Sequence, residues 1–244
     1  ETPERVLQQF AERLEQTLAT RQVAAVVTEA GIVTGWGSTV VAPKGYLALV
    51  RRLTERYGTV MILDEVGTGF SRCGRLFGLE LDGVVPDVVT MAKGITNGGA
   101  AMGAVVMRED LAEVACAKSL FISTFGWTPV ACAAALKTLE IHRRDRVWEK
   151  AERDGAYIVA RLREALAEHP HAGDIWGIGL EIGLDIVADR ATKAKDPQRV
   201  VRIMQEGFVR GVHLTGDQQS TIQLMPPLTI DRVQLDDGLN RLIE

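Results

Sequence analysis

Lys93 stands where a lysine could do chemistry, close behind an apolar run of strand length. Ala92, Lys93 and Gly94 directly follow the run Val88–Met91. Burial disfavours the ammonium form of a lysine, so a partly desolvated amine at a strand end can attack an aldehyde. A solvated surface lysine is the alternative, and position alone favours that alternative.

Asp64 changes this balance because it offers a carboxylate at the end of a second apolar run. It directly follows Val60–Leu63, where a carboxylate needs a cationic or hydrogen-bonding partner to stay ionised. Capping of the next loop is one explanation, and we assign the neighbouring Glu65 a structural role. Together, however, Asp64 and Lys93 are the two groups that pyridoxal phosphate requires: a lysine for its aldehyde and a carboxylate for its pyridine nitrogen.

Both residues depend on a sheet to bring them together, and the hydrophobic pattern predicts one. Apolar runs alternate with helical periods, which is typical of a largely parallel sheet covered on both faces. The ligand crevice of such a sheet lies at the carboxyl ends of its strands. We expect strands at Val23–Thr28, Thr59–Leu63, Val88–Met91 and Met102–Met107, and helices at Thr2–Leu18, Tyr46–Tyr57, Leu111–Lys118 and Pro129–Arg143.

Local signals set some of the boundaries. Thr2 precedes Pro3 as an N-cap precedes a first-turn proline, and Gly58 follows the Tyr46–Tyr57 helix as a C-cap would. The glycine-rich stretch Gly31–Gly45 has neither the helical nor the strand period, and we expect it to be a long loop.

The pattern changes near residue 144. Beyond it we expect a long helix, short strands punctuated by glycines and two further helices, which is typical of an α+β domain. The helices are expected at about Trp148–Glu168, at about Pro197–Arg210 and from Asp231, and the strands within Asp174–Ala188 and at Thr221–Leu224. The predicted organisation is part of a large α/β domain with a mostly parallel sheet over residues 1–144, and a smaller C-terminal α+β domain over residues 145–244.

The composition excludes several functional classes. Of the 244 residues, 28 are Lys or Arg and 32 are Asp or Glu, so the net charge is −4. A weakly acidic chain without a long basic run is a poor nucleic-acid binder, and no apolar run approaches the roughly 20 residues of a membrane helix. Cys73, Cys116 and Cys132 are odd in number and widely spaced, so we expect no disulfide framework and no zinc or other metal site, and we expect a cytoplasmic protein.

Several long segments resemble one family. The segment LDEVGTGFSRCGRLFGLELDGVVPDVVTMAKGITNGG, Leu63–Gly99, resembles the core motif of the class III (ω-type) aminotransferases, which are fold type I pyridoxal phosphate enzymes. The resemblance continues through MGAVVM, STFGWTPVACAAALKTLEI, GDIWGIGLEIGLDIV and QLMPPLTI, and it spans nearly the whole chain. Nothing here resembles the N-terminal half of the family, so the resemblance implies an incomplete large domain.

The resemblance implies a role for each of four residues. Asp64 would pair with the pyridine nitrogen of pyridoxal 5'-phosphate, and Val66 would pack on the face of its ring. Lys93 would form the internal aldimine and then shuttle the proton. Thr124 would reach across the interface of a homodimer to the cofactor phosphate of the other subunit. The implied reaction moves an amino group from an amine or amino acid donor to an oxo acid.

Two departures from the family pattern limit these expectations. Family members commonly hold a substrate carboxylate with an arginine where this chain has Gln223, and a neutral amide cannot supply the charged fork of a guanidinium. We therefore expect one substrate to lack an α-carboxylate at this subsite. The N-terminal half of the family, which binds the cofactor phosphate at a helix N-terminus, has no counterpart in the sequence. We expect the 244 residues alone to have little activity, to require that half, and to leave a strand edge of the sheet unprotected.

Two alternatives stay open on the sequence. Enzymes of the same fold and with the same aspartate and lysine also include aminomutases and decarboxylases, because fold and cofactor do not settle the reaction. The other alternative is an inactive, truncated paralogue that serves as a dimerisation scaffold.

Overall fold

The chain forms two compact units that share its N-terminal part. The computed structural model describes residues 2–35, 38–118, 123–124 and 126–244. The first unit comprises Glu1–Gly31, Ala42–Phe70 and Phe77–Asp145, and the second comprises Ile32–Val41, Ser71–Leu76 and Arg146–Glu244. Two short segments of the predicted large domain therefore belong to the second unit. The division into domains at residue 144 stays a prediction.

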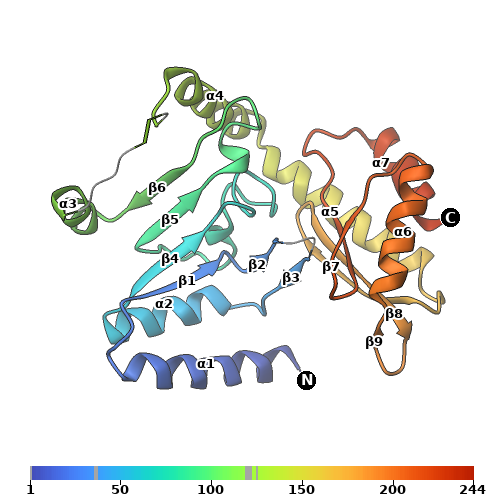
Figure 1. Cartoon of the computed structure of the whole chain (residues 1–244), viewed down its shortest axis with the longest axis horizontal. Coiled ribbons are helices and arrows are strands. Elements are labelled where there is room, and N and C mark those ends of the chain that lie inside the picture. The colour runs from blue at the N-terminus through green and yellow to red at the C-terminus, as the bar shows by residue number, and fades with distance from the viewer. Residues whose placement is uncertain (1, 36–37, 119–122, 125) are drawn as a thin grey trace. The chain divides into compact units, whose positions relative to one another are not determined.

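A four-stranded sheet forms the centre of the first unit (Figure 1). Its strands, in spatial order, are β1 (Ala25–Glu29), β4 (Val60–Asp64), β5 (Val88–Met91) and β6 (Ala104–Met107). The pairs β1–β4 and β4–β5 are parallel, and β6 runs antiparallel to β5. A parallel connection needs a crossover that is usually an α-helix, whereas β5 and β6 are joined by a segment whose only helical turn is the short 3₁₀ helix η2 (Lys93–Ile95). The sheet is thus mostly parallel, as predicted.

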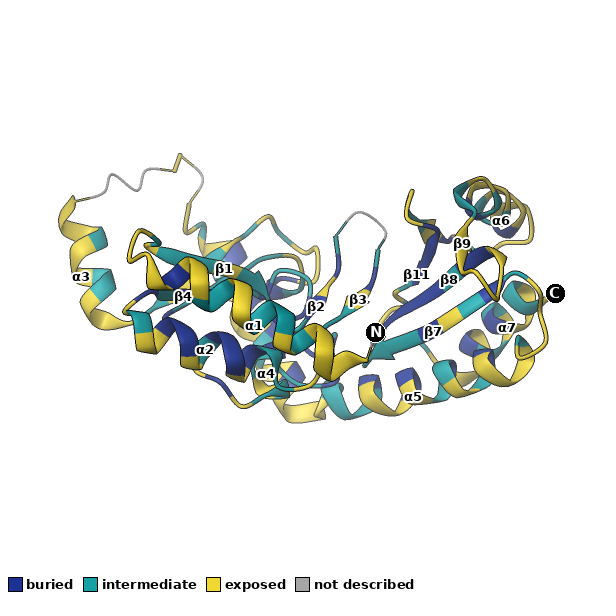
Figure 2. Cartoon of the chain, turned by 90° about the horizontal axis from the view of Figure 1, so that it is seen from below, coloured by how far each residue is buried: buried dark blue, intermediate teal, exposed yellow. Residues whose placement is uncertain are grey.

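The helices of the first unit are α1 (Pro3–Ala19), α2 (Tyr46–Tyr57), α3 (Glu109–Lys118) and α4 (Pro129–Asp145). Helix α1 begins as predicted, because the Thr2 hydroxyl oxygen accepts a hydrogen bond from the Arg5 N–H at 3.4 Å. Gly58 ends α2 in the left-handed conformation at φ +67°, also as predicted. Figure 2 shows long buried stretches on α2 and an exposed outer face on α1, which packs against α2.

The second unit is an antiparallel sheet with helices on both faces. Strands β10 (Thr215–Gly216), β11 (Thr221–Leu224), β8 (Glu181–Asp189) and β7 (Ala172–Ile178) follow in that spatial order, and β9 (Ala194–Lys195) pairs with β8. Its helices are α5 (Val147–Ala165), α6 (Pro197–Val209) and α7 (Arg232–Ile243). In Figure 2, α6 lies on one side of β8 and β11, and α5 and α7 lie on the other. The sequence predicted the α+β character and the bounds of β11, but neither β9 nor β10.

The stretch Gly31–Gly45 was predicted as a long loop, and this prediction is wrong in part. It contains an antiparallel hairpin of β2 (Ile32–Val33) and β3 (Val40–Val41). Within the second unit, the Trp176 indole N–H donates to the Thr39 carbonyl oxygen at 2.7 Å. A two-residue strand is too short to show the alternation that identifies strands in a sequence. The hairpin is held by residues far along the chain, such as Trp176, which a local pattern does not reveal.

None of the helices that the structure describes combines the length and the apolarity needed to cross a bilayer.

Candidate active site

Asp64 is the last residue of β4 and lies at the carboxyl end of the parallel strands. In the strand register it stands opposite Glu29 of β1 and Thr90 of β5. The side chain is half-buried, and its Oδ1 accepts a hydrogen bond from the Val66 N–H at 2.8 Å. This short turn fixes the carboxylate at the strand end, where ligands of such sheets bind.

Lys93 begins η2, two residues after the end of β5. Since β4 and β5 are adjacent and parallel, the structure brings Lys93 and Asp64 to the same edge of one sheet. The expected partial desolvation of Lys93 is not observed, because the residue is exposed in this structure. Its backbone has φ +42°, which lies in the left-handed region that residues other than glycine rarely adopt.

The two remaining predicted residues lie in loops. Val66 is half-buried in the turn after β4 and holds Asp64 through its N–H. Thr124 is exposed in a turn before α4, next to residues 119–122 and 125, which lie outside the described residues. In the described part of the chain, no hydrogen bond links Thr124 to Asp64 or Lys93.

Glu65 is the site residue whose contacts the sequence analysis did not foresee. It is fully buried, and its carboxylate accepts hydrogen bonds from the Gly78 N–H at 2.9 Å, the Leu79 N–H at 2.7 Å and the Thr68 hydroxyl. Burial raises the pKa of Glu65, although these hydrogen bonds act in the opposite direction. The carboxylate therefore ties the loop after β4 to the 3₁₀ helix η1 (Gly78–Leu81). The only sequence signal was a second acidic residue directly after Asp64.

Gln223 is buried inside the second unit. Its amide Nε2 lies 3.2 Å from the Thr34 carbonyl oxygen, 2.9 Å from the Ser38 carbonyl oxygen and 2.7 Å from Glu181 Oε1. An amide has two N–H groups for these three acceptors. The Gln223 side chain is thus engaged in holding the β2–β3 hairpin on the sheet of this unit.

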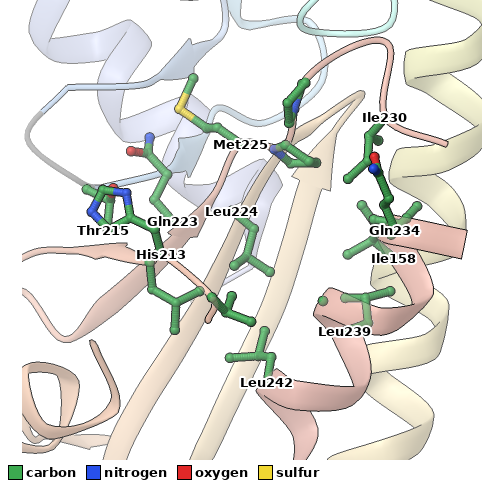
Figure 3. Close-up of a pocket in the computed structure, with 16 residues that line it drawn as sticks. Ile158, His213, Thr215, Gln223, Leu224, Met225, Ile230, Gln234, Leu239 and Leu242 are labelled. Atoms are coloured by element: carbon green, nitrogen blue, oxygen red, sulfur yellow. The ribbon is translucent and has the colours of Figure 1, made fainter. Parts of the chain in front are cut away.

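A separate cavity of about 330 Å³ lies entirely within the second unit (Figure 3). Figure 3 shows Leu224 of β11, Ile158 of α5 and Leu239 and Leu242 of α7 around it. Its lining is mostly apolar, and none of the four predicted site residues contributes to it. Asp64 and Lys93 lie instead at the sheet edge of the first unit.

The residues at that edge fit pyridoxal phosphate. A carboxylate that ends one strand and an amine that follows the neighbouring parallel strand are the two groups that its ring nitrogen and its aldehyde need. Within the described residues, no group of three or more His, Cys, Asp or Glu side chains is arranged to hold a metal ion.

Comparison with known proteins gives one family. The family model described as aminotransferase class-III matches residues 1–244. Putrescine–pyruvate aminotransferase of Pseudomonas aeruginosa is 32% identical over 233 residues, which cover 93% of this chain and 51% of the relative. Leucine/methionine racemase of Thermococcus litoralis is 33% identical over 220 residues, which cover 90% of this chain and 49% of the relative.

Solved structures agree. A thermostable (S)-enantioselective omega-transaminase from Thermomicrobium roseum matches with a TM-score of 0.89 and 36% identity, over 99% of this chain and 55% of that one. This likeness confirms the predicted fold class. The chain spans about half the length of the relatives that it matches. With a family model that covers all of its residues and a close structural likeness, the chain belongs to the class III aminotransferases.

Proposed function

We propose that the complete protein uses pyridoxal 5'-phosphate to transfer an amino group from an amine or amino acid to an oxo acid. The observation that carries this proposal is the position of Asp64 and Lys93 at the ends of two adjacent parallel strands. Membership of the class III aminotransferases and relatives named as aminotransferases support it. When bound, the cofactor supplies an aldehyde that bonds to an amine and a ring that takes up electrons from the substrate carbon.

Each predicted residue has one task in this proposal. Asp64 holds a proton on the ring nitrogen by its negative charge, and Val66 packs on the face of the ring. The Lys93 amine would hold the cofactor at its aldehyde carbon, with the aldehyde oxygen leaving as water, and would move a proton to or from the substrate carbon. Thr124 donates its hydroxyl to the phosphate bound by the other subunit of a homodimer.

Residues outside these 244 complete the site in this proposal. The 244 residues span about half of the relatives' length, and the family resemblance assigns the phosphate cradle to the N-terminal half. The backbone N–H groups of a helix N-terminus there would bind the phosphate. We also propose a cytoplasmic location, on the cysteine pattern of the sequence.

Gln223 bears on the choice of substrate. Its amide nitrogen is engaged with two backbone carbonyl oxygens and with Glu181, and it carries no positive charge. The proposal is therefore that one substrate has no α-carboxylate at this subsite, as in a simple amine or an ω-amino acid. The test is to measure the turnover of simple amines and of α-amino acids by the complete protein. A clear preference for α-amino acids would contradict the proposed substrate class.

Reduction with borohydride tests the cofactor and the lysine together. The complete protein is incubated with pyridoxal phosphate, reduced and digested, and mass spectrometry is expected to find the added group on Lys93. A Lys93→Arg variant should lose the label, whereas Lys118→Arg, which changes an exposed lysine at the end of α3, should keep it. Labelling spread over other lysines, or absent, would refute the assignment.

One relative favours a second candidate function. Because the leucine/methionine racemase is 33% identical to this chain, the same machinery could invert an amino acid without amino transfer. The two functions differ in their products: amino transfer yields a free oxo product and consumes an added oxo acid, whereas racemisation yields only the mirror-image amino acid. Chiral chromatography with and without an added oxo acid separates them.

A further inference from the structure

The backbone of Lys93 is held in an unfavourable conformation. Its φ of +42° lies in the left-handed region, which favours glycine, although the residue at this position is a lysine. Such a conformation persists only where the surrounding structure enforces it, and residues of this kind cluster at functional sites. The residues that follow Lys93 pack closely against buried side chains.

Phe70 covers the backbone directly after Lys93. A Cβ atom added to Gly94 would lie 2.9 Å from Phe70 Cβ and 3.3 Å from Phe70 Cγ, which leaves no room for a side chain at position 94. Phe70 is only 3% exposed and forms one buried cluster with Ile95 and Ala135. The residues after Lys93 are thus packed against the Phe70 side chain, and Ile95 joins the same buried cluster.

Phe70 is itself fixed by the turn that begins at the strand end of Asp64. The Gly69 N–H donates to the Glu65 carbonyl oxygen at 3.0 Å, and Phe70 has φ +55°. The ring of Phe77 packs edge-on against that of Phe70 with centroids 5.4 Å apart. The buried Glu65 carboxylate holds η1, which begins directly after Phe77, through the N–H groups of Gly78 and Leu79. A continuous series of contacts therefore runs from the end of β4 to the backbone of Lys93.

We propose that Phe70 is a positioning residue for Lys93. By packing on Gly94 it keeps Lys93 in its left-handed conformation and sets the direction in which the amine leaves the sheet edge. This inference rests on the proposed function, in which that amine bonds to pyridoxal phosphate. It assigns no contact between Phe70 and the cofactor or the substrate.

Three variants of the complete protein, each loaded with pyridoxal phosphate, test the proposal. Phe70→Ala removes the packing on Gly94, and Phe70→Leu keeps part of it. Phe10→Ala is the matched control, because Phe10 is a partly buried phenylalanine of the same unit that packs against Tyr46 with ring centroids 5.1 Å apart. For each variant we measure the bound cofactor, the fraction of it that borohydride fixes on Lys93, kcat and KM for the amino donor, and thermal stability.

The expected result separates positioning from stability. Phe70→Ala should lower the fraction of bound cofactor fixed on Lys93 and lower kcat on the order of 10–100-fold, since a small misplacement of a reacting group has effects of this size. KM for the donor should change little. Phe70→Leu, which keeps only part of the packing, should show the same two losses to a smaller but measurable degree. Phe10→Ala should lower thermal stability and leave the fixed fraction and kcat as in the parent.

Other outcomes overturn the proposal. If Phe70→Ala lowers stability but leaves the fixed fraction and kcat unchanged, Phe70 has only a structural role. If Phe70→Ala does not fold, the comparison of Phe70→Leu with the parent decides in the same way, and an unchanged fixed fraction refutes positioning. Failure of the proposed function is recognised separately, because the parent protein itself would then carry no label on Lys93.

Discussion

Two neighbouring carboxylates at the end of β4 have different surroundings and therefore different tasks. Glu65 is fully buried, and three donors surround it: the Thr68 hydroxyl from its own loop and the N–H groups of Gly78 and Leu79 in η1. Asp64 is half-buried at the edge of the sheet, and the Val66 N–H orients it. A buried carboxylate with all its donors supplied by the protein serves the fold, whereas one that reaches a strand end can serve a ligand.

This difference leads to a prediction for Asp64. In the complete protein, Asp64→Asn should lower kcat/KM for amino transfer by about 10²–10³-fold, the usual loss when one preorganised electrostatic partner is removed. A neutral amide cannot stabilise the positive charge of a protonated ring nitrogen. Asp237→Asn is the control, because Asp237 is an exposed carboxylate of α7 paired with Arg241. Steady-state kinetics would contradict the assignment if Asp64→Asn retained the parent activity.

Asp87 joins three elements of the first unit and depends on pH. Its Oδ2 accepts hydrogen bonds from the Met61 N–H of β4 at 2.7 Å and from Arg51 of α2 at 3.0 Å, and its Oδ1 pairs with Arg108 after β6. Burial alone would raise the pKa of Asp87, but the hydrogen bonds from Met61 and Arg51 and the two arginine charges outweigh it and lower this pKa.

The lowered pKa fixes the sign of the pH dependence. The ionised carboxylate stabilises the fold fully above the unfolded value, near 3.8, and this contribution is lost as the pH falls through the lower pKa of the folded state. Asp87→Asn should therefore lower the free energy of unfolding by about 3 kcal/mol at neutral pH, and the difference should shrink in acid. Denaturant unfolding between neutral and acid pH measures it. Asp110 is an exposed partner of the same Arg108, so Asp110→Asn should change the free energy of unfolding little. Equal changes in both variants would contradict the prediction.

Glycines in two helices should respond to alanine with opposite signs. A Cβ atom at Gly155 of α5 would lie 1.8 Å from the carbonyl oxygen of Gly179, whereas one at Gly238 of α7 would have no atom within 4 Å. Gly155→Ala should therefore destabilise the protein by about 3 kcal/mol, and Gly238→Ala should stabilise it by about 0.5–1 kcal/mol through helix propensity. Thermal unfolding of both variants checks this, and an equal sign for the two changes would refute it.

These elements also show what the sequence could predict. Helix α2 and its Gly58 cap follow from local residues, and so do the strands that end at Asp64 and lead to Lys93. The β2–β3 hairpin does not, because Trp176 and Gln223, far along the chain, hold it. The packing of Phe70 on Gly94 was equally hidden, since it arises between a turn and the short 3₁₀ helix η2 rather than from a periodic pattern.

At the scale of the whole molecule, the two units cannot be separated by a single cut of the chain. The second unit contains Ile32–Val41 and Ser71–Leu76, both from the N-terminal part. Arg72 belongs to this unit, where it donates to the carbonyl oxygens of Leu180 at 3.0 Å and Pro226 at 2.7 Å. A fragment that began at Arg146 would lack Arg72 and both of these segments, so the second unit requires residues from the N-terminal part of the chain.

The outer strands of the first unit carry exposed valines. In the part of the chain that the structure describes, β1 and β6 are the outer strands of its sheet. Val27 of β1 is 66% exposed, and Val105 and Val106 of β6 are 52% and 58% exposed. A bare apolar edge promotes pairing with other chains. This fits the expectation that further residues of the complete protein cover the sheet.

A lysine on β6 should therefore have opposite effects in the two forms of the protein. In the 244-residue chain, Val106→Lys should reduce concentration-dependent association, because charged side chains on edge strands oppose strand pairing. In the complete protein, where we expect β6 to be covered, it should lower the free energy of unfolding by about 3 kcal/mol through an unpaired buried charge. Sedimentation and denaturant unfolding measure the two effects. Val201→Lys on α6, where the valine is 47% exposed, should be neutral in both forms. If Val106→Lys is equally neutral in the complete protein, β6 remains an open edge there and the missing part of the sheet lies elsewhere.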